Sequence, residues 1–230
     1  RQAWFEMMPV PRRAGDRIHR RFTWGRLADF LMLDVRSHRD PELPANVDFG
    51  LLEGQDTRRP PADQMFAPGR TTLGADQKAW LERRLTGSRA DWRVVGSSYN
   101  VCPWKITDYD TPEARAADPN LPRNGGVYVS NEAWDDYGYE RAELLQFLLD
   151  RGIENVVFNS GHTHFYLASE LMPDHDDPAG TVAAFDFVTG SQTADPDPRS
   201  LASEDLLTFA RHVMLEQTQP YMKALDLLHQ

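Results

Sequence analysis

The residues of this chain best suited to chemistry are two histidines, His162 and His164. They follow residues 156–158, a β-branched and aromatic run that predicts a buried strand. Gly161 is predicted to let the backbone turn at the carboxyl end of that strand, the edge at which open α/β sheets bind ligands. Two imidazoles at this spacing can reach one metal ion or a close pair, and imidazole suits zinc, iron, copper and nickel. The alternative is a surface loop whose histidines bind nothing.

A second candidate position lies at the end of another predicted strand. The apolar run that begins at Phe30 ends in an acid, so the carboxyl end of this strand presents Asp34. Asp34 is a candidate catalytic acid, and the alternative is that it caps a loop or pairs with an arginine. Arg36 either forms that pair or holds a phosphate group bidentately.

Alternating strands and helices indicate an α/β fold that positions these residues. Further strands are predicted at residues 92–96, 181–188 and 221–228, and helices at residues 72–85, 139–151 and 204–216. Long segments without periodicity, residues 38–70 and 103–133, are predicted to be loops.

Composition excludes several classes of function. The chain has 230 residues and a formal net charge of −10, which argues against a nucleic-acid partner but leaves phosphate-bearing substrates open. No apolar run is long enough to span a bilayer. Cys102 is the single cysteine, so an internal disulfide is excluded.

The other histidines have no ligand-like partners in sequence, and most are predicted to lie on the surface or in loops. They are His19, His38, His175, His212 and His229. His175 lies among Asp174, Asp176 and Asp177, which predicts a solvated acidic loop, with calcium binding as the alternative.

Several segments, taken in order, are similar to one family. They are residues 4–10 (WFEMMPV), 33–36 (LDVR), 72–81 (TLGADQKAWL), 134–141 (WDDYGYER) and 187–191 (FVTGS). Together they resemble the PhoD-type alkaline phosphatase and phospholipase D family, within the calcineurin-like metallophosphoesterases. The resemblance covers nearly all of the chain.

The resemblance implies a metallophosphoesterase-type four-layer α/β/β/α sandwich, of which residues 1–230 would form a single catalytic domain truncated at both ends. It implies an extracytoplasmic hydrolase of phosphate mono- or diesters, with small molecules or lipids as substrates. His162 and His164 would hold divalent or trivalent ions, two of them, drawn from Fe, Zn, Mn or Ca. Such ions generate a metal-bound hydroxide. Trp134, Asp135 and Tyr137 would wall the pocket, and packing at the start of a helix is the alternative for all three.

The sequence departs from the family pattern in three ways. His162 stands where PhoD-type proteins usually have an acid, and Ser97 and Ser98 are poor metal ligands. The family's early motifs are missing from this chain, so activity is expected to need an upstream segment or a companion chain. Two other functions stay open: a non-catalytic relative that binds phosphorylated ligands or a partner, and a mononuclear zinc site.

Overall fold

The fold is given by a computed structural model of the chain. It describes residues 2–8, 17–44, 47–48, 58–59, 62–108, 110–120, 124–128, 133–163, 166–177, 179–190 and 222–223. The predicted helix at residues 204–216 and His164 lie outside these ranges. Of the predicted strand at residues 221–228, only two residues are described.

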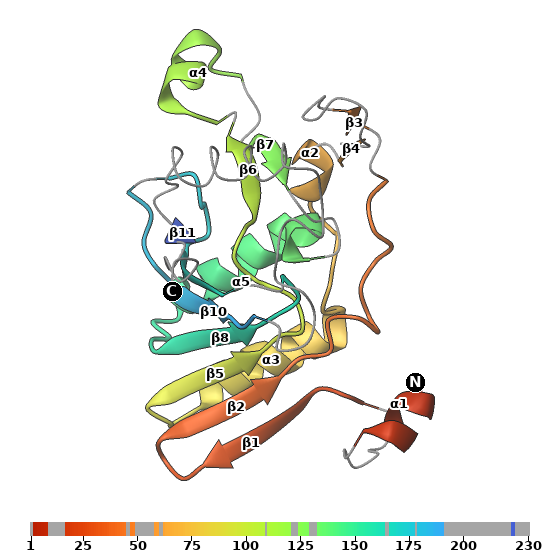
Figure 1. The fold of residues 1–230 in the computed structure, drawn as a ribbon. Coiled ribbons are helices and arrows are strands. Elements are labelled where there is room, and N and C mark those ends of the chain that lie inside the picture. Colours follow the sequence, from red (N-terminus) through yellow and green to blue (C-terminus); the bar gives the residue numbers. More distant parts are fainter. Residues whose placement is uncertain are drawn as a thin grey trace, which may run out of the picture.

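A seven-stranded mixed sheet organises the molecule (Figure 1). Its strands, in spatial order, are β1 (Arg20–Trp24), β2 (Ala28–Met32), β5 (Trp92–Gly96), β8 (Val156–Ser160), β10 (Ala184–Val188), β9 (Leu167–Leu171) and β11 (Met222–Lys223). Strands β2, β5, β8 and β10 run parallel, whereas β1 and β9 pair antiparallel with their neighbours. The parallel strands therefore end at one edge of the sheet, where the predicted site residues follow them.

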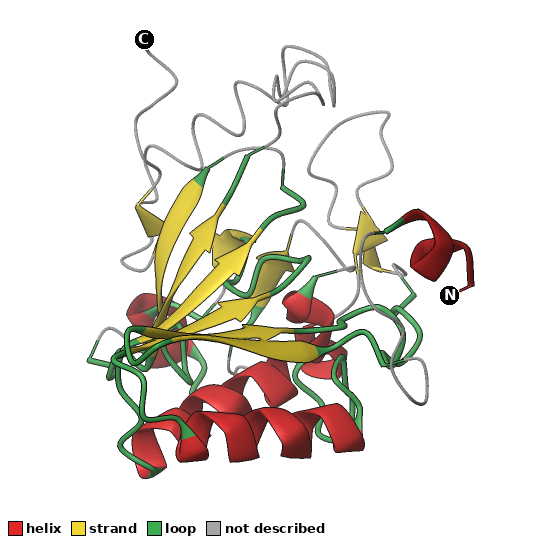
Figure 2. Cartoon of the chain, turned by 90° about the horizontal axis from the view of Figure 1, so that it is seen from below, coloured by secondary structure: helices red, strands yellow, loops and turns green. Residues whose placement is uncertain are grey.

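Two long helices cover one face of this sheet (Figure 2). They are α3 (Ala75–Gly87) and α5 (Gly138–Asp150), which connect the consecutive parallel strands β2, β5 and β8. Their leucines, among them Leu81 and Leu144, pack with Val95 and Phe158 in the main core. Gly152, with φ 59°, ends α5, and its N–H donates to the Leu149 carbonyl. The predictions of an α/β fold and of a glycine after this helix are confirmed.

Shorter elements occupy the two segments that were predicted to be loops. They are β3 (Val47–Asp48), β4 (Arg58–Arg59), α2 (Ala62–Met65), β6 (Lys105–Asp108), α4 (Pro112–Ala117) and β7 (Gly126–Tyr128). Helix α4 begins where Thr111 Oγ1 accepts a hydrogen bond from Ala114 N–H, with Pro112 in its first turn. A six-residue helix, α1 (Gln2–Met7), and a 3₁₀ helix, η2 (Trp134–Tyr137), complete the described elements. None of the described helices has the length and apolar character needed to cross a bilayer.

The other face of the sheet is apolar and partly exposed. Its central row runs across five strands in register: Phe22, Phe30, Val94, Val157 and Phe185. Trp24 is 72% exposed and Phe187 47% exposed on the same face. Sheets bury an apolar face against another layer, so this face marks a packing surface.

Candidate functional site

The loops that follow β2, β5 and β8 meet at the ring of Tyr99, which is 1% exposed. The guanidinium carbon of Arg36 lies 4.4 Å from the ring centroid and that of Arg39 lies 5.5 Å from it. The His162 ring approaches at a centroid separation of 4.6 Å and an interplanar angle of 72°. These four residues form the Tyr99 cluster. Tyr99 was not predicted from the sequence, because only Ser97 and Ser98 of this loop were considered, as poor metal ligands.

The sharp turn after β8 is made by His162 and not by Gly161, so that prediction was wrong. His162 has φ 83°, in the left-handed region, whereas Gly161 is not among the glycines with positive φ. A side chain in that region costs about 1–2 kcal/mol. Thr189 stabilises the start of this turn, because its backbone N–H and its Oγ1 both donate hydrogen bonds to the Ser160 carbonyl. Non-glycine residues kept in strained backbone tend to gather at functional sites.

Asp186 ties the turn of His162 to the loop of Tyr99. Its Oδ1 accepts a hydrogen bond from Ser160 Oγ at 2.7 Å, and its Oδ2 accepts from the N–H groups of Val101 and Cys102 at 2.7 and 2.9 Å. Burial raises the pKa of Asp186, although these donors oppose the shift. In the sequence, Asp186 stands out as a single acid between Phe185 and Phe187 in an apolar strand. This pattern could have indicated a buried, hydrogen-bonded carboxylate, but Asp186 was not among the predicted site residues.

Asp34 holds the turn that carries Arg36. Its Oδ1 accepts hydrogen bonds from the N–H groups of Arg36 and Ser37 at 3.3 and 3.0 Å, and its Oδ2 lies 3.9 Å from His38 Nε2. Gln77 fixes the backbone of Asp34 by donating to its carbonyl and accepting from its N–H. This is the loop-capping alternative for Asp34, and a catalytic role for its carboxylate stays a prediction.

Trp134 and Tyr137 lie in the interior, 1% and 0% exposed. Trp134 Nε1 donates to Ser97 Oγ, and Tyr137 OH donates to the Asp40 carbonyl at 2.6 Å. Neither ring is open to a substrate in this structure. Both residues thus have the packing contacts of the alternative, and their part in a pocket wall stays a prediction.

The metal-ligand set predicted around His162 is not assembled by the described residues. Within those ranges, no group of three or more His, Cys, Asp and Glu side chains could hold a metal ion. His162 contacts Tyr99, Asp34 caps a turn, and His164 lies outside the described residues. The described part of the chain therefore does not by itself fit a dinuclear centre.

Comparison with known proteins decides the family of this chain. The family model of PhoD-like phosphatases matches residues 1–227. The chain belongs to the PhoD-like phosphatase family. It is 30% identical over 198 residues to alkaline phosphatase D of Bacillus subtilis (strain 168), a match that covers 84% of this chain and 30% of that protein.

A solved structure of PhoD matches with a TM-score of 0.68 and 25% identity, covering 96% of this chain and 37% of the other. The resemblance inferred from sequence is thus confirmed, and so is the metallophosphoesterase-like fold. The chain spans about a third of the length of the relatives it matches.

The acids near the start of α5 serve as anchors for three loops. Glu140 Oε2 accepts hydrogen bonds from the N–H groups of Thr72 and Leu73, ahead of α3. Asp136 Oδ2 accepts from Leu43 N–H at 2.8 Å. Asp135 pairs with Arg141 and holds the loop after Tyr99. The family segment at residues 134–141 therefore positions the site loops from inside the protein.

We predict that Asp136→Asn flattens the pH dependence of stability. Burial raises the pKa of Asp136 to about 7, which outweighs the Leu43 N–H and the guanidinium of Arg70, 3.7 Å away. Because the folded-state pKa lies above the unfolded value of 3.8, the folded protein binds more protons between pH 4 and 7. The contribution of Asp136 to stability therefore falls as pH rises through that window, by up to about 1.4 kcal/mol per pH unit.

Urea unfolding at a series of pH values from 4.5 to 7.5 checks this prediction. The free energy of unfolding of Asp136→Asn should fall less over the series than that of the wild type. Asp91→Asn, which removes an exposed carboxylate, serves as the control. Parallel curves for Asp136→Asn and the wild type would show that this carboxyl does not titrate as argued.

His175 is buried, so the prediction of a solvated acidic loop around it was wrong. Its Nε2 lies 3.0 Å from Tyr128 OH, and burial lowers the pKa of His175 well below its usual value. Lys105 Nζ is buried beside it and contacts the carboxylates of Asp108 and Asp176, each at 2.6 Å. Of the acids of this segment, Asp176 is thus paired with Lys105 of β6.

Proposed function

We propose that this PhoD-like phosphatase hydrolyses phosphate mono- or diesters at the Tyr99 cluster. The observation that carries the proposal is the convergence of Arg36, Arg39 and His162 on one buried ring at the carboxyl ends of three parallel strands. Ligands of open α/β sheets bind at this edge. Guanidinium groups match phosphate oxygens with paired, charge-assisted hydrogen bonds. Membership of a phosphatase family supports ester hydrolysis as the chemistry.

Within this proposal the two arginines have different tasks. Arg39 pairs with Glu42 and donates to Tyr99 OH at 3.4 Å, so its position is fixed on both sides. Arg36 is exposed, with its guanidinium carbon over the Tyr99 ring, so its N–H groups remain open to bind the phosphate group. The T-shaped contact between Tyr99 and His162 places the imidazole beside the same ring as the two arginines.

Metal dependence is part of the proposal. His162 and His164 would act as ligands for one or two ions of Fe, Zn, Mn or Ca, together with groups supplied from outside the described residues. When bound, such ions activate water and neutralise phosphate charge. The described residues do not complete this ligand set.

A second layer is also proposed for the apolar face of the sheet. The row from Phe22 to Phe185 has the character of the inner face of a sandwich, and the relatives are about three times as long as this chain. We infer that a further sheet, from an adjoining segment or a companion chain, packs on it and supplies the remaining ligands. An extracytoplasmic location and small-molecule or lipid phosphate esters complete the proposal.

Hydrolysis of p-nitrophenyl phosphate and bis(p-nitrophenyl) phosphate tests this function on the protein in its complete encoded form. Turnover of at least one ester is expected, with loss after chelation and recovery when Fe, Zn, Mn or Ca is added back. Arg36→Ala should lower kcat/KM by about 10- to 100-fold, because a charge-assisted hydrogen bond contributes about 1.5–3 kcal/mol. Arg83→Ala on the exposed face of α3 is the control. Activity that persists unchanged after complete metal removal would contradict metal dependence.

The alternative is a family member that binds phosphorylated ligands without cleaving them. The absence of a three-ligand metal group among the described residues favours it. The same assay separates the two: binding of a phosphate ester that depends on Arg36, with no turnover under any metal condition, would establish the binding protein.

A further inference from the structure

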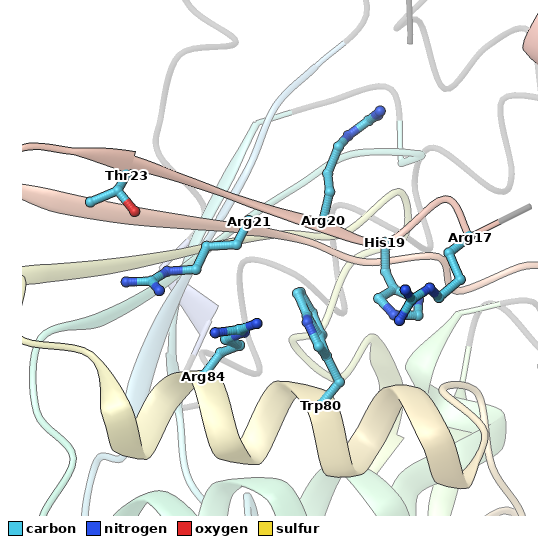
Figure 3. Close-up of a pocket in the computed structure, with 7 residues that line it drawn as sticks. All are labelled: Arg17, His19, Arg20, Arg21, Thr23, Trp80 and Arg84. Carbon is cyan, nitrogen blue, oxygen red and sulfur yellow. The ribbon is translucent and has the colours of Figure 1, made fainter. Parts of the chain in front are cut away.

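A pocket of about 360 Å³ opens between the edge strand β1 and helix α3 (Figure 3). Its lining includes Arg17, Arg20, Arg21, Arg84, His19 and Trp80. None of these residues belongs to the Tyr99 cluster. The side chains of His19 and Arg17 point toward α3, and Trp80 and Arg84 rise from this helix toward β1, whereas Arg20 points away from the helix (Figure 3). We call this the arginine pocket.

The arginine pocket is strongly cationic in a chain whose formal net charge is −10. No acidic side chain of the described residues lines it. Asp29 accepts hydrogen bonds from Arg21 at 3.0, 2.8 and 2.6 Å and so neutralises that guanidinium group. Arg20 points away from the pocket, toward the Phe22 ring. Arg17 and Arg84 therefore supply the positive charge that a bound anion would meet.

His19 provides an independent observation that points to a ligand. The side chain is 8% exposed, and its Nδ1 is buried with no hydrogen-bond partner among the described residues. Its ring packs on Trp80 at a centroid separation of 4.7 Å, which fixes the imidazole at the wall of the pocket. Burial and the nearby Arg17 both lower the pKa of His19. A buried polar atom left without a partner destabilises the protein, and a ligand that supplies the partner removes this destabilisation.

We propose that the arginine pocket binds the phosphate group of a small molecule, at a site separate from the Tyr99 cluster. Guanidinium groups bind phosphate oxygens in pairs, and a phosphate offers His19 both oxygen acceptors and a hydroxyl donor. The volume falls within the range of small-molecule sites, so the ligand is a phosphate ester or a polyphosphate. This inference does not depend on hydrolysis at the Tyr99 cluster.

Isothermal titration at constant ionic strength, with orthophosphate, pyrophosphate and glycerol phosphate as probes, tests the proposal. The protein carries Arg36→Ala throughout, so that binding at the Tyr99 cluster is weakened and any remaining site is distinct from it. One phosphate-binding site is expected to remain. Arg84→Ala and Arg17→Ala should each weaken it at least about tenfold, the loss of one charge-assisted contact.

Arg83→Ala is the matched control, because Arg83 precedes Arg84 on α3 and does not line the pocket. It should bind each probe as the parent does. Equal weakening by Arg83→Ala and Arg84→Ala would reduce the effect to general surface charge and overturn the site. No measurable binding in the Arg36→Ala parent, with folding verified by circular dichroism, would overturn it as well. The preferred probe distinguishes a polyphosphate from a phosphate ester as the ligand.

Discussion

Replacing His162 with glycine is expected to abolish phosphate-ester hydrolysis and leave the protein at least as stable as the wild type. Most point substitutions lower stability. Here the backbone of His162 has φ 83°, a conformation that glycine adopts without steric cost. The variant therefore relieves strain while it removes the imidazole that contacts Tyr99.

His162→Ala separates the two effects. Alanine also lacks the imidazole, so both variants should lose at least about 100-fold in kcat/KM, equivalent to about 2.7 kcal/mol. Alanine keeps the Cβ that causes the strain, which costs about 1–2 kcal/mol, whereas glycine adds about 0.5–1 kcal/mol of backbone entropy. The glycine variant should therefore be the more stable of the pair, by about 0.5–1 kcal/mol in urea unfolding.

Asn155→Gly is the control for this pair. Asn155 also has positive φ, 55°, but it precedes β8, at the opposite end of the strand from the Tyr99 cluster. This variant should match the wild type in activity. If His162→Gly unfolds more readily than His162→Ala, the strain argument is wrong, and if it retains turnover, the imidazole has no part in the reaction.

Local sequence pattern predicted the framework well, for physical reasons. The strand at residues 92–96 and the helix before Gly152 were predicted from the sequence. Both depend on local propensity: β-branched residues favour a strand where they occur, and a glycine favours the end of a helix. Strands β1 and β9 were missed. Strand β9 reads LASEL and has little β-branched character, so it is held by its pairing with β10 and not by its own propensity.

The site itself depends on contacts between distant segments, which local pattern does not report. More than sixty residues separate Arg36 from Tyr99, and more than sixty separate Tyr99 from His162. The three residues meet because the parallel strands that precede them are neighbours in the sheet. Trp134 next to two acids has the composition of a pocket wall. Whether Asp135 faces solvent or a backbone N–H is decided by the packing of α5, and the structure shows the second case.

The largest loss of stability is expected for Asp135→Asn. Asp135 and Arg141 are both buried, their side chains 0% and 4% exposed, and Arg141 Nη1 donates to Asp135 Oδ1 at 2.7 Å. Asparagine leaves the guanidinium charge buried without a counter-ion, which costs about 3–5 kcal/mol. Arg141 Nη2 already lacks a hydrogen-bond partner among the described residues, so no second group compensates for the loss.

Replacing Arg141 should lower the free energy of unfolding less than replacing Asp135. Of the two side chains, only the Asp135 carboxyl can lose its charge, by taking up a proton. Burial raises the pKa of Asp135 even with Arg141 beside it, and without Arg141 the carboxyl is free to take up a proton. Guanidinium does not deprotonate in proteins. We therefore expect Arg141→Met to destabilise less than Asp135→Asn at pH 5. Its cost should grow toward pH 8, since a raised folded-state pKa makes stability fall as pH rises.

Urea unfolding of both variants at pH 5 and pH 8 measures this asymmetry. Glu143→Gln is the control, because it breaks the exposed pair with Lys78, also 2.7 Å long, and should cost below about 1 kcal/mol. Equal losses for Asp135→Asn and Arg141→Met at both pH values would contradict the argument. Asp135 Oδ2 also accepts from Trp104 N–H, and Arg141 Nη1 donates to the Val101 carbonyl. The loop after Tyr99 should therefore loosen in the less stable variant, and phosphatase activity should fall with it.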